Sequence, residues 1–495
     1  MPDPSALPDR SRVAANAVIL SAAHFLAAAI VAVYTICLVR FLGPKTLGRF
    51  TIFAIWTDLI FMVFDAGVSQ AAMRMEAQKP SEALRIFRTA LALKFGLNLV
   101  AAALALGVLR VWFGAGLDAQ AALAATAASA AASFAMLYVA HFKALELALP
   151  ITVAAVGSGL LSAGIGLGLI WAKWGLAALL LVPGFGALGK ILYLEVAMRR
   201  LKSESLASPE RSKLSAPLAM ELLRHALPLG AGEMFRILAM RLDTLLLAAW
   251  STELEVGLYN ACLRVHNYAQ NFLEGYYGAV MPVMAHRFAH DRQGLERVSE
   301  QTAAVASMVA VPLALGAAGL AGPAVALLYG HPFVAAGPAL LFLGLSLASN
   351  IVNGTYASIL ISGDRASSRA YAAGWAGGLA AMAASSAVLI PALGSKGAAL
   401  SCLMMGWCAH LWFMIYTDKR LFPVRILAPF SACAPAGCAA VLAFWALSPL
   451  GDWPAGAAGF VAYILVLLRG GIYSDLAATA SSLRGMLHRR KDSAT

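Results

Sequence analysis

The sequence predicts an all-α polytopic membrane protein on the basis of its composition, its recurring apolar runs and the distribution of its charges. Of the 495 residues, 61% are hydrophobic and 13% are charged, and the mean hydropathy is +0.76. A water-soluble domain of this size does not need so large an apolar fraction for its core. We expect helices because the sequence lacks the alternating segments of roughly ten residues that form membrane β-barrels.

Apolar runs long enough to cross a bilayer recur along the whole chain. We expect about fourteen transmembrane helices, which start near residues 15, 48, 84, 119, 148, 175, 226, 256, 298, 333, 370, 396, 428 and 454. The segments around 148–198 and 428–471 are short and interrupted by Gly and Pro, so the number stays open between about 12 and 14. The first run is too long for a cleaved signal peptide, and we expect it to stay in the membrane.

The basic residues indicate how the chain is oriented. Most of the 37 Lys and Arg fall in alternate loops, and the positive-inside rule then puts both termini in the cytoplasm. The net charge of +12 is therefore explained by contact with anionic membrane lipids. We expect no nucleic-acid partner.

The first two helices are joined by a tight turn. The stretch Arg40–Phe50 contains Gly43 and Pro44 and has almost no loop. Its three cations either bind an anion or extend to the lipid headgroups. The second helix then carries four polar residues at helical spacing, which we expect on one face: Thr51, Asp58, Asp65 and Ser69.

A weak internal repeat predicts two lobes. Asp58 aligns with Asn267 and Asp65 with Glu274 when the first half of the chain is laid on the second. A repeat of six helices leaves both copies in the same orientation, so we expect a pseudo-two-fold axis along the membrane normal. The predicted parts are an N-lobe (1–198), a cytoplasmic linker (199–222), a C-lobe (223–417), two further helices (418–473) and a basic cytoplasmic tail (474–495).

Two helices of the second half are unusually polar for membrane spans. The helix expected over 226–250 contains Glu233, Arg236, Arg241 and Asp243. The helix expected over 256–282 carries a stripe about 80° wide, which consists of Asn260, Arg264, Asn267, Asn271 and Glu274. A charge at the bilayer centre costs at least ~2.5 to 3.5 kcal/mol, so the stripe must face protein or a water-filled cavity. Polar contacts between packed helices are the structural alternative.

The sequence gives no sign of an enzyme. No external loop gathers carboxylates, histidines or metal ligands, and there is no phosphate-binding loop of the ATPase type. We therefore expect no catalytic residues, no metal and no cofactor. Two lobes with charged stripes favour a transporter with alternating access over a channel, which would show a ring of one residue type.

Five short segments carry a family resemblance: Arg40–Phe50, Asp65–Arg74, Leu227–Pro228, Arg241–Leu246 and Glu255–Ala261. They resemble the polysaccharide-exporting flippases of the MATE-like (MOP) superfamily, which act on lipid-linked sugars of O-antigen, capsule and exopolysaccharide. It implies a carrier in the bacterial inner membrane that moves an undecaprenyl-diphosphate-linked oligosaccharide from the cytoplasmic to the periplasmic leaflet. It also implies polysaccharide polymerase and glycosyltransferase partners.

The resemblance and the charges together suggest candidate site residues. Arginine suits a diphosphate because its planar guanidinium donates forked hydrogen bonds, and Asn suits sugar hydroxyls. The predicted substrate-binding residues are Arg264, Arg241, Arg236, Asn260, Asn267, Asn271 and Lys94. The acids predict coupling to protons or sodium, or else pairing with nearby cations. The predicted ion-coupling residues are Asp65, Glu274, Asp58 and Asp243.

Two other functions remain open at this point. A multidrug or cation antiporter of the same fold would also use acidic residues in its cavity. A scaffold of a glycan-assembly complex would not transport at all.

Overall fold

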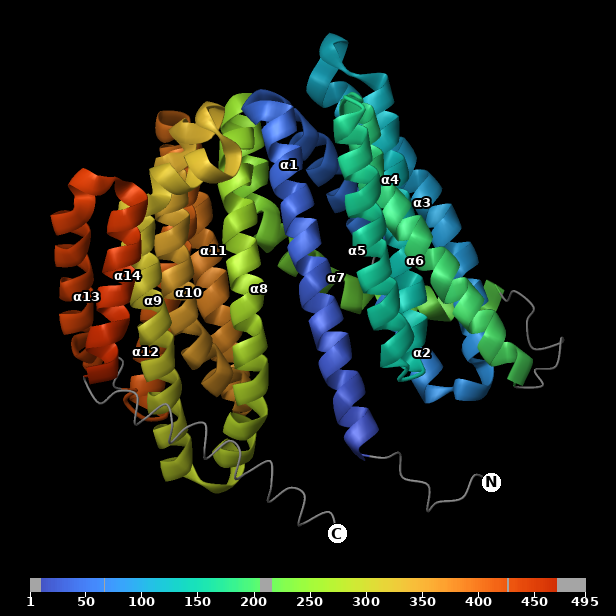
Figure 1. Ribbon diagram of the computed structural model, residues 1–495. Coiled ribbons are helices and arrows are strands. Elements are labelled where there is room, and N and C mark those ends of the chain that lie inside the picture. The colour runs from blue at the N-terminus through green and yellow to red at the C-terminus, as the bar shows by residue number, and fades with distance from the viewer. Residues whose placement is uncertain (1–9, 66, 205–215, 425–426, 470–495) are drawn as a thin grey trace. The chain divides into compact units, whose positions relative to one another are not determined.

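The computed structural model describes residues 10–65, 67–204, 216–424 and 427–469 (Figure 1). Within these residues the regular elements are helices, and none is a strand. The predicted all-α class is therefore confirmed.

The long helices of the first half follow one another with short connections. They are α1 (Arg10–Asp65), α2 (Val68–Gln78), α3 (Ala83–Phe113), α4 (Ala119–Ala144), α5 (Ala148–Trp171), α6 (Leu176–Glu204) and α7 (Ala216–Trp250). Two short 3-10 helices, η1 (Pro80–Glu82) and η2 (Gly114–Gly116), precede and follow α3.

The second half repeats this pattern of long helices and short turns. It contains α8 (Glu253–His290), α9 (Arg292–Tyr329), α10 (Gly337–Ser362), α11 (Arg365–Leu393), α12 (Ser395–Arg420), α13 (Leu427–Leu447) and α14 (Asp452–Arg469). The 3-10 helices η4 (His331–Ala336) and η5 (Ser448–Leu450) lie in two of its turns.

Element α1 is two helices in sequence. Gly43 has φ 68° and ψ 169°, which is not a helical conformation, and Pro44 follows it. Glycine adopts a positive φ at no steric cost, and Pro favours the first turn of a new helix. The tight turn predicted within Arg40–Phe50 is therefore confirmed.

The prediction that four polar residues share one face of the second helix is wrong for the last of them, Ser69. Gly67 adopts the left-handed conformation (φ 78°, ψ 9°), so the helix stops at Asp65 and α2 begins at Val68. Ser69 therefore belongs to a different helix from Asp58 and Asp65. The spacing of residues could not reveal this because an isolated glycine also occurs inside membrane helices.

Eleven segments of the described residues are long and apolar enough to cross a membrane. One of them, Ala29–Gln78, covers the later part of the first predicted run and the whole start of the second. Helices α7 and α8 cover the two polar runs but are not among the eleven. These segments support a multi-pass membrane protein, but they do not confirm the predicted number of fourteen transmembrane helices.

Helix α8 is longer than predicted. The sequence suggested an end at Pro282, but the helix continues to His290 with Pro282 inside it. Proline is tolerated within membrane helices when neighbouring groups satisfy the freed backbone carbonyl.

The chain divides into two compact units, Met1–Arg241 and Leu242–Thr495. The division falls within α7, after the predicted linker 199–222. The first turns of α7 belong to the first unit because Leu218 and Leu222 pack in a cluster with residues of α3 and α4 such as Phe87. The proposed boundaries of the lobes and their symmetry stay predictions.

Each unit has its own apolar core. In the second unit, Tyr356 of α10 and Phe413 of α12 are fully buried in a cluster that α8 and α9 complete. Helices α13 and α14 pack on α9 through a smaller cluster around Tyr463. Many large apolar side chains point outward instead, including Trp171, which is 89% exposed. Such an outer surface suits lipid as the surrounding solvent.

Small residues allow helices α4 and α6 to approach closely. A Cβ atom placed on Gly184 of α6 would lie 2.9 Å from the Cα of Ala128 on α4. Within a membrane, close backbone approach replaces the hydrophobic effect as the source of helix association.

We expect Gly184→Ala to destabilise the protein by about 1–3 kcal/mol because the new methyl group meets the backbone of Ala128. The matched control is Gly107→Ala, where a Cβ meets nothing within 4 Å and the better helix propensity of Ala should raise stability slightly. The measurement is the midpoint of thermal unfolding of the full chain in detergent. Equal midpoints for the two variants would contradict the close packing of α4 and α6.

Candidate functional site

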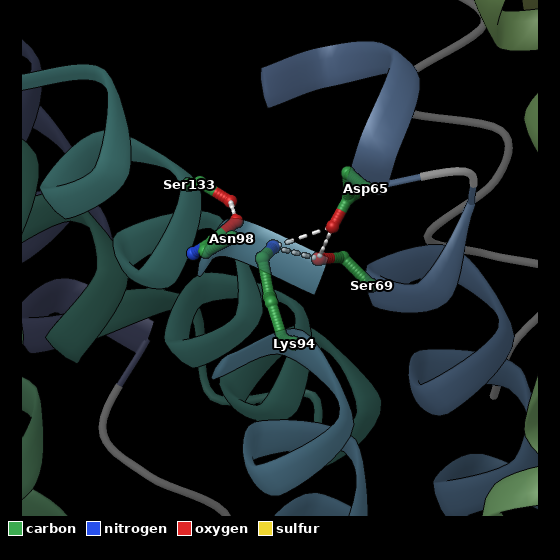
Figure 2. A network of polar contacts seen from close by, with 5 residues as sticks. All are labelled: Asp65, Ser69, Lys94, Asn98 and Ser133. Atoms are coloured by element: carbon green, nitrogen blue, oxygen red, sulfur yellow. Dashed lines mark hydrogen bonds and ion pairs between the residues drawn. The ribbon is translucent and has the colours of Figure 1, made fainter. Parts of the chain in front are cut away.

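Polar side chains meet inside the first unit where α1, α2 and α3 converge (Figure 2). The Nζ of Lys94 lies 2.5 Å from Oδ1 of Asp65 and donates to Oγ of Ser69 at 2.8 Å. Ser69 in turn donates to Asp65 at 2.9 Å. Lys94 is completely buried, and the side chain of Asp65 is 13% exposed. The three side chains form a compact charged cluster with no net charge.

A second contact extends this cluster along α3 and α4. Asn98 lies one helical turn after Lys94, and its Oδ1 accepts a hydrogen bond of 3.1 Å from Ser133 of α4 (Figure 2). The Nδ2 of Asn98 is buried and has no partner among the described residues. Helical spacing of four residues therefore places two polar groups of α3 against two different neighbours.

Asp58 lies two turns before Asp65 and makes a separate contact with α4. Ser129 donates to Oδ1 of Asp58 at 2.7 Å, and its hydroxyl also lies 2.9 Å from that of Thr57. The positive charge of Arg241 acts on Asp58 as well. Both predicted acids of this unit thus have polar partners within it.

The cluster can keep two opposite charges in an apolar interior. An ionised carboxylate buried alone is costly, and an ammonium group at hydrogen-bond distance offsets this cost. The hydroxyl of Ser69 satisfies further hydrogen-bonding capacity of both ions. A sodium ion would compete with Lys94 for the same carboxylate oxygen.

In the second unit, the predicted acid Asp243 is also buried and partnered. Its Oδ2 accepts a hydrogen bond of 2.5 Å from the hydroxyl of Tyr259, and its Oδ1 accepts from the backbone of Thr244 at 2.6 Å. Asn260 is buried and donates to the carbonyl of Val256 in its own helix at 3.0 Å. The tyrosine next to the predicted asparagine is therefore one of the partners of Asp243.

The structure describes only part of the polar stripe. Arg264 is half-buried, and its charge acts on Tyr329 of α9, whereas Asn267 is exposed. The side chains of Arg236, Asn271 and Glu274 lie outside the described residues. The predicted site residues are thus placed on their helices, and their roles stay predictions.

Reasoning from the sequence missed a buried acid–histidine pair. Glu76 of α2 lies 2.6 Å from Nδ1 of His141 on α4, and both residues are at most 4% exposed. The ring of Phe87 packs on the imidazole with centroids 4.6 Å apart. The second oxygen of Glu76 has no partner among the described residues. Only the fold brings the two residues together, since they are far apart in the sequence.

The fold is similar to that of solved membrane transporters. The structure of the lipid II flippase MurJ in an inward closed conformation matches with TM-score 0.69 and 14% identity, covering 93% of this chain and 100% of that chain. An inward-facing multidrug resistance MATE family transporter of the MOP superfamily matches with TM-score 0.58 and 13% identity, over 81% and 95%. A MOP superfamily transporter from Pyrococcus furiosus matches with TM-score 0.54 and 15% identity, covering 82% of this chain and 95% of that chain. The fold is that of the MOP transporters.

Residues 37–338 match the polysaccharide biosynthesis protein family, and the chain belongs to this family. The matched range includes parts of both compact units. A comparison with curated proteins finds no match. The family resemblance inferred from short segments of the sequence is therefore confirmed.

We expect Lys94→Met to destabilise the protein by about 3–5 kcal/mol because it leaves Asp65 buried without its cation. The double variant Lys94→Met/Asp65→Leu should recover part of this loss, since no charge then remains. Thermal unfolding of Lys94→Met, Asp65→Leu and the double variant in detergent measures the coupling between the two residues. Lys143→Met, which removes an exposed lysine of α4, is the control. Additive effects of the two substitutions would show that the pair does not stabilise the fold.

Proposed function

We propose that the protein moves an undecaprenyl-diphosphate-linked oligosaccharide from the cytoplasmic to the periplasmic leaflet by alternating access, for cell-surface polysaccharide synthesis. The observation that carries this proposal is membership of the polysaccharide biosynthesis protein family. The fold adds support because it is similar to that of a lipid II flippase. The proposed role is transport without chemical conversion of the substrate.

The proposed anion site uses the cations of α7 and α8. Arg264 is the central residue because it lies on the polar stripe of α8 and has a guanidinium suited to phosphate oxygens. Arg241 and Arg236 are proposed to share the diphosphate, and Asn260, Asn267 and Asn271 to bind sugar hydroxyls. For Lys94, the contact with Asp65 means that binding a phosphate requires the ion pair to open.

The proposed coupling ions are protons or sodium, taken up by Asp65, Glu274, Asp58 or Asp243. The carboxylate of Asp65 already contacts Lys94 and Ser69, so an ion bound there would have to displace or alter these contacts. Uptake of a proton by Asp65 would weaken its attraction for Lys94 and so loosen the contact between α1 and α3.

The expected consequence of removing the anion site is loss of export. Arg264→Ala should abolish glycan export at normal membrane abundance, while Arg264→Lys should retain part of it because an ammonium ion replaces the guanidinium imperfectly. Export is measured in a deletion strain with a defined surface glycan. Lys396→Ala, at an exposed position of α12, is the control and should export normally.

Two results of this experiment would contradict the proposed role. Wild-type export by Arg264→Ala would place the diphosphate elsewhere. Disappearance of the variant from the membrane, with Arg264→Lys stable, would make the arginine a packing residue of α8.

We propose that the protein resides in the bacterial inner membrane with both termini in the cytoplasm, beside polymerase and glycosyltransferase partners. The support is the concentration of Lys and Arg in alternate loops. Reporter fusions near Lys202 and Arg489 should read cytoplasmic, and a fusion near Asp452 should read periplasmic. The same side for both positions would refute this topology.

The second candidate is a multidrug or cation antiporter. The observation in its favour is the fold similarity to a multidrug resistance MATE transporter. The two functions differ in a simple measurement, since a deletion strain of an antiporter becomes drug-sensitive while its surface glycan stays intact.

A further inference from the structure

A groove opens between the start of α11 and the end of α12 in the second unit. Its volume is about 580 Å³, and its lining comes from the first turns of α11 and the last turns of α12. The two membrane-span candidates here are Ala366–Leu393 and Ser395–Arg420. The groove therefore lies where the apolar part of both helices meets water.

Two arginines lie on the rim of this groove. Arg369 and Arg420 both line it, and both are exposed. Neither forms a hydrogen bond or ion pair with another residue of the described chain. Two guanidinium groups at a membrane boundary attract anions, and each retains its full set of donors.

One carboxylate also lines the groove, but its hydrogen bonds turn it toward the helix backbone. Asp364 accepts from the backbone N–H of Ser367 at 2.8 Å and from its hydroxyl at 2.8 Å. These hydrogen bonds hold the pKa of Asp364 below its usual value, so it stays ionised and caps α11. The lining then keeps an excess of one positive charge.

The side of the groove toward the membrane interior is lined by small apolar residues of α11 and aromatic residues of α12. Ala370 and Ala373 of α11 form one side, and Trp412 and Tyr416 of α12 form the other. Trp412 donates from Nε1 to the carbonyl of Ala370 at 2.8 Å, which fixes the indole against α11. Since Trp412, Tyr416 and Arg420 are spaced by four residues, they lie along one face from the apolar interior to the water boundary.

We propose that this groove binds an anionic phospholipid, with the phosphodiester between Arg369 and Arg420 and an acyl chain against Ala373 and Trp412. Charge complementarity selects the anionic headgroup, and the apolar end gives the chain a surface that a free phosphate ion would leave unused. The site differs from the proposed substrate site because its residues lie on α11 and α12, apart from the stripe of α8. It does not depend on which substrate the protein carries.

The first test is lipid retention by the full chain in detergent, measured by native mass spectrometry with phosphatidylglycerol and with phosphatidylcholine. Phosphatidylglycerol should bind better because the choline cation of phosphatidylcholine lies beside the same phosphodiester. Arg369→Gln/Arg420→Gln should weaken phosphatidylglycerol binding roughly tenfold and weaken phosphatidylcholine binding less, so that the preference shrinks. Lys419→Gln is the matched control because Lys419 is exposed beside Arg420 but does not line the groove. Equal binding of the two lipids, or an unchanged affinity in the double variant, would overturn the proposal.

The second test separates a lipid from a free phosphate and keeps both arginines. Ala373→Leu fills the apolar end and should weaken phosphatidylglycerol binding, whereas Ala372→Leu, also exposed but outside the lining, should not. Inorganic phosphate at millimolar concentration should not displace the lipid. Displacement by phosphate together with normal binding by Ala373→Leu would show that the arginines form a site for a soluble anion instead.

Discussion

The contact between Lys94 and Asp65 shows the constraint under which the first unit is built. A charge in an apolar interior is costly without a partner, and here the partner is supplied from another helix at 2.5 Å. Ser69 joins both ions, so α1, α2 and α3 must stay in register for the contact to exist. Across the break at Gly67, Ser69 of α2 still donates a hydrogen bond to Asp65 at the end of α1.

Polar contacts and close packing act together in this fold. Helices that present Ala and Gly to one another leave little room for rearrangement, as the approach of Gly184 to Ala128 shows. The acids Asp58, Asp65 and Asp243 each accept hydrogen bonds from within their own compact unit. Among the described residues, these three acids are therefore satisfied within their own unit, and any ion that bound to one of them would have to exchange with a contact that already exists.

The arginines of the groove between α11 and α12 are in a different environment from the buried charges of the first unit. At the boundary of the membrane, water is available, so exposed Arg369 and Arg420 need no protein partner. The aromatic residues beside them have an apolar ring with a polar tip, which suits the same boundary. The described acids Asp58, Asp65 and Asp243 thus have partners within the protein, whereas Arg369 and Arg420 at the edge of their spans are exposed.

The sequence alone determined the all-α membrane class, the turn at Gly43 and the family, because hydropathy, glycine conformation and short segments are local properties. It also identified Lys94 and Asp65 as polar residues within apolar helices. Only the tertiary structure decided that these two residues contact one another and that Glu76 meets His141. Such pairs join different helices, and periodicity along one helix gives a facing direction but no information about which neighbour lies opposite.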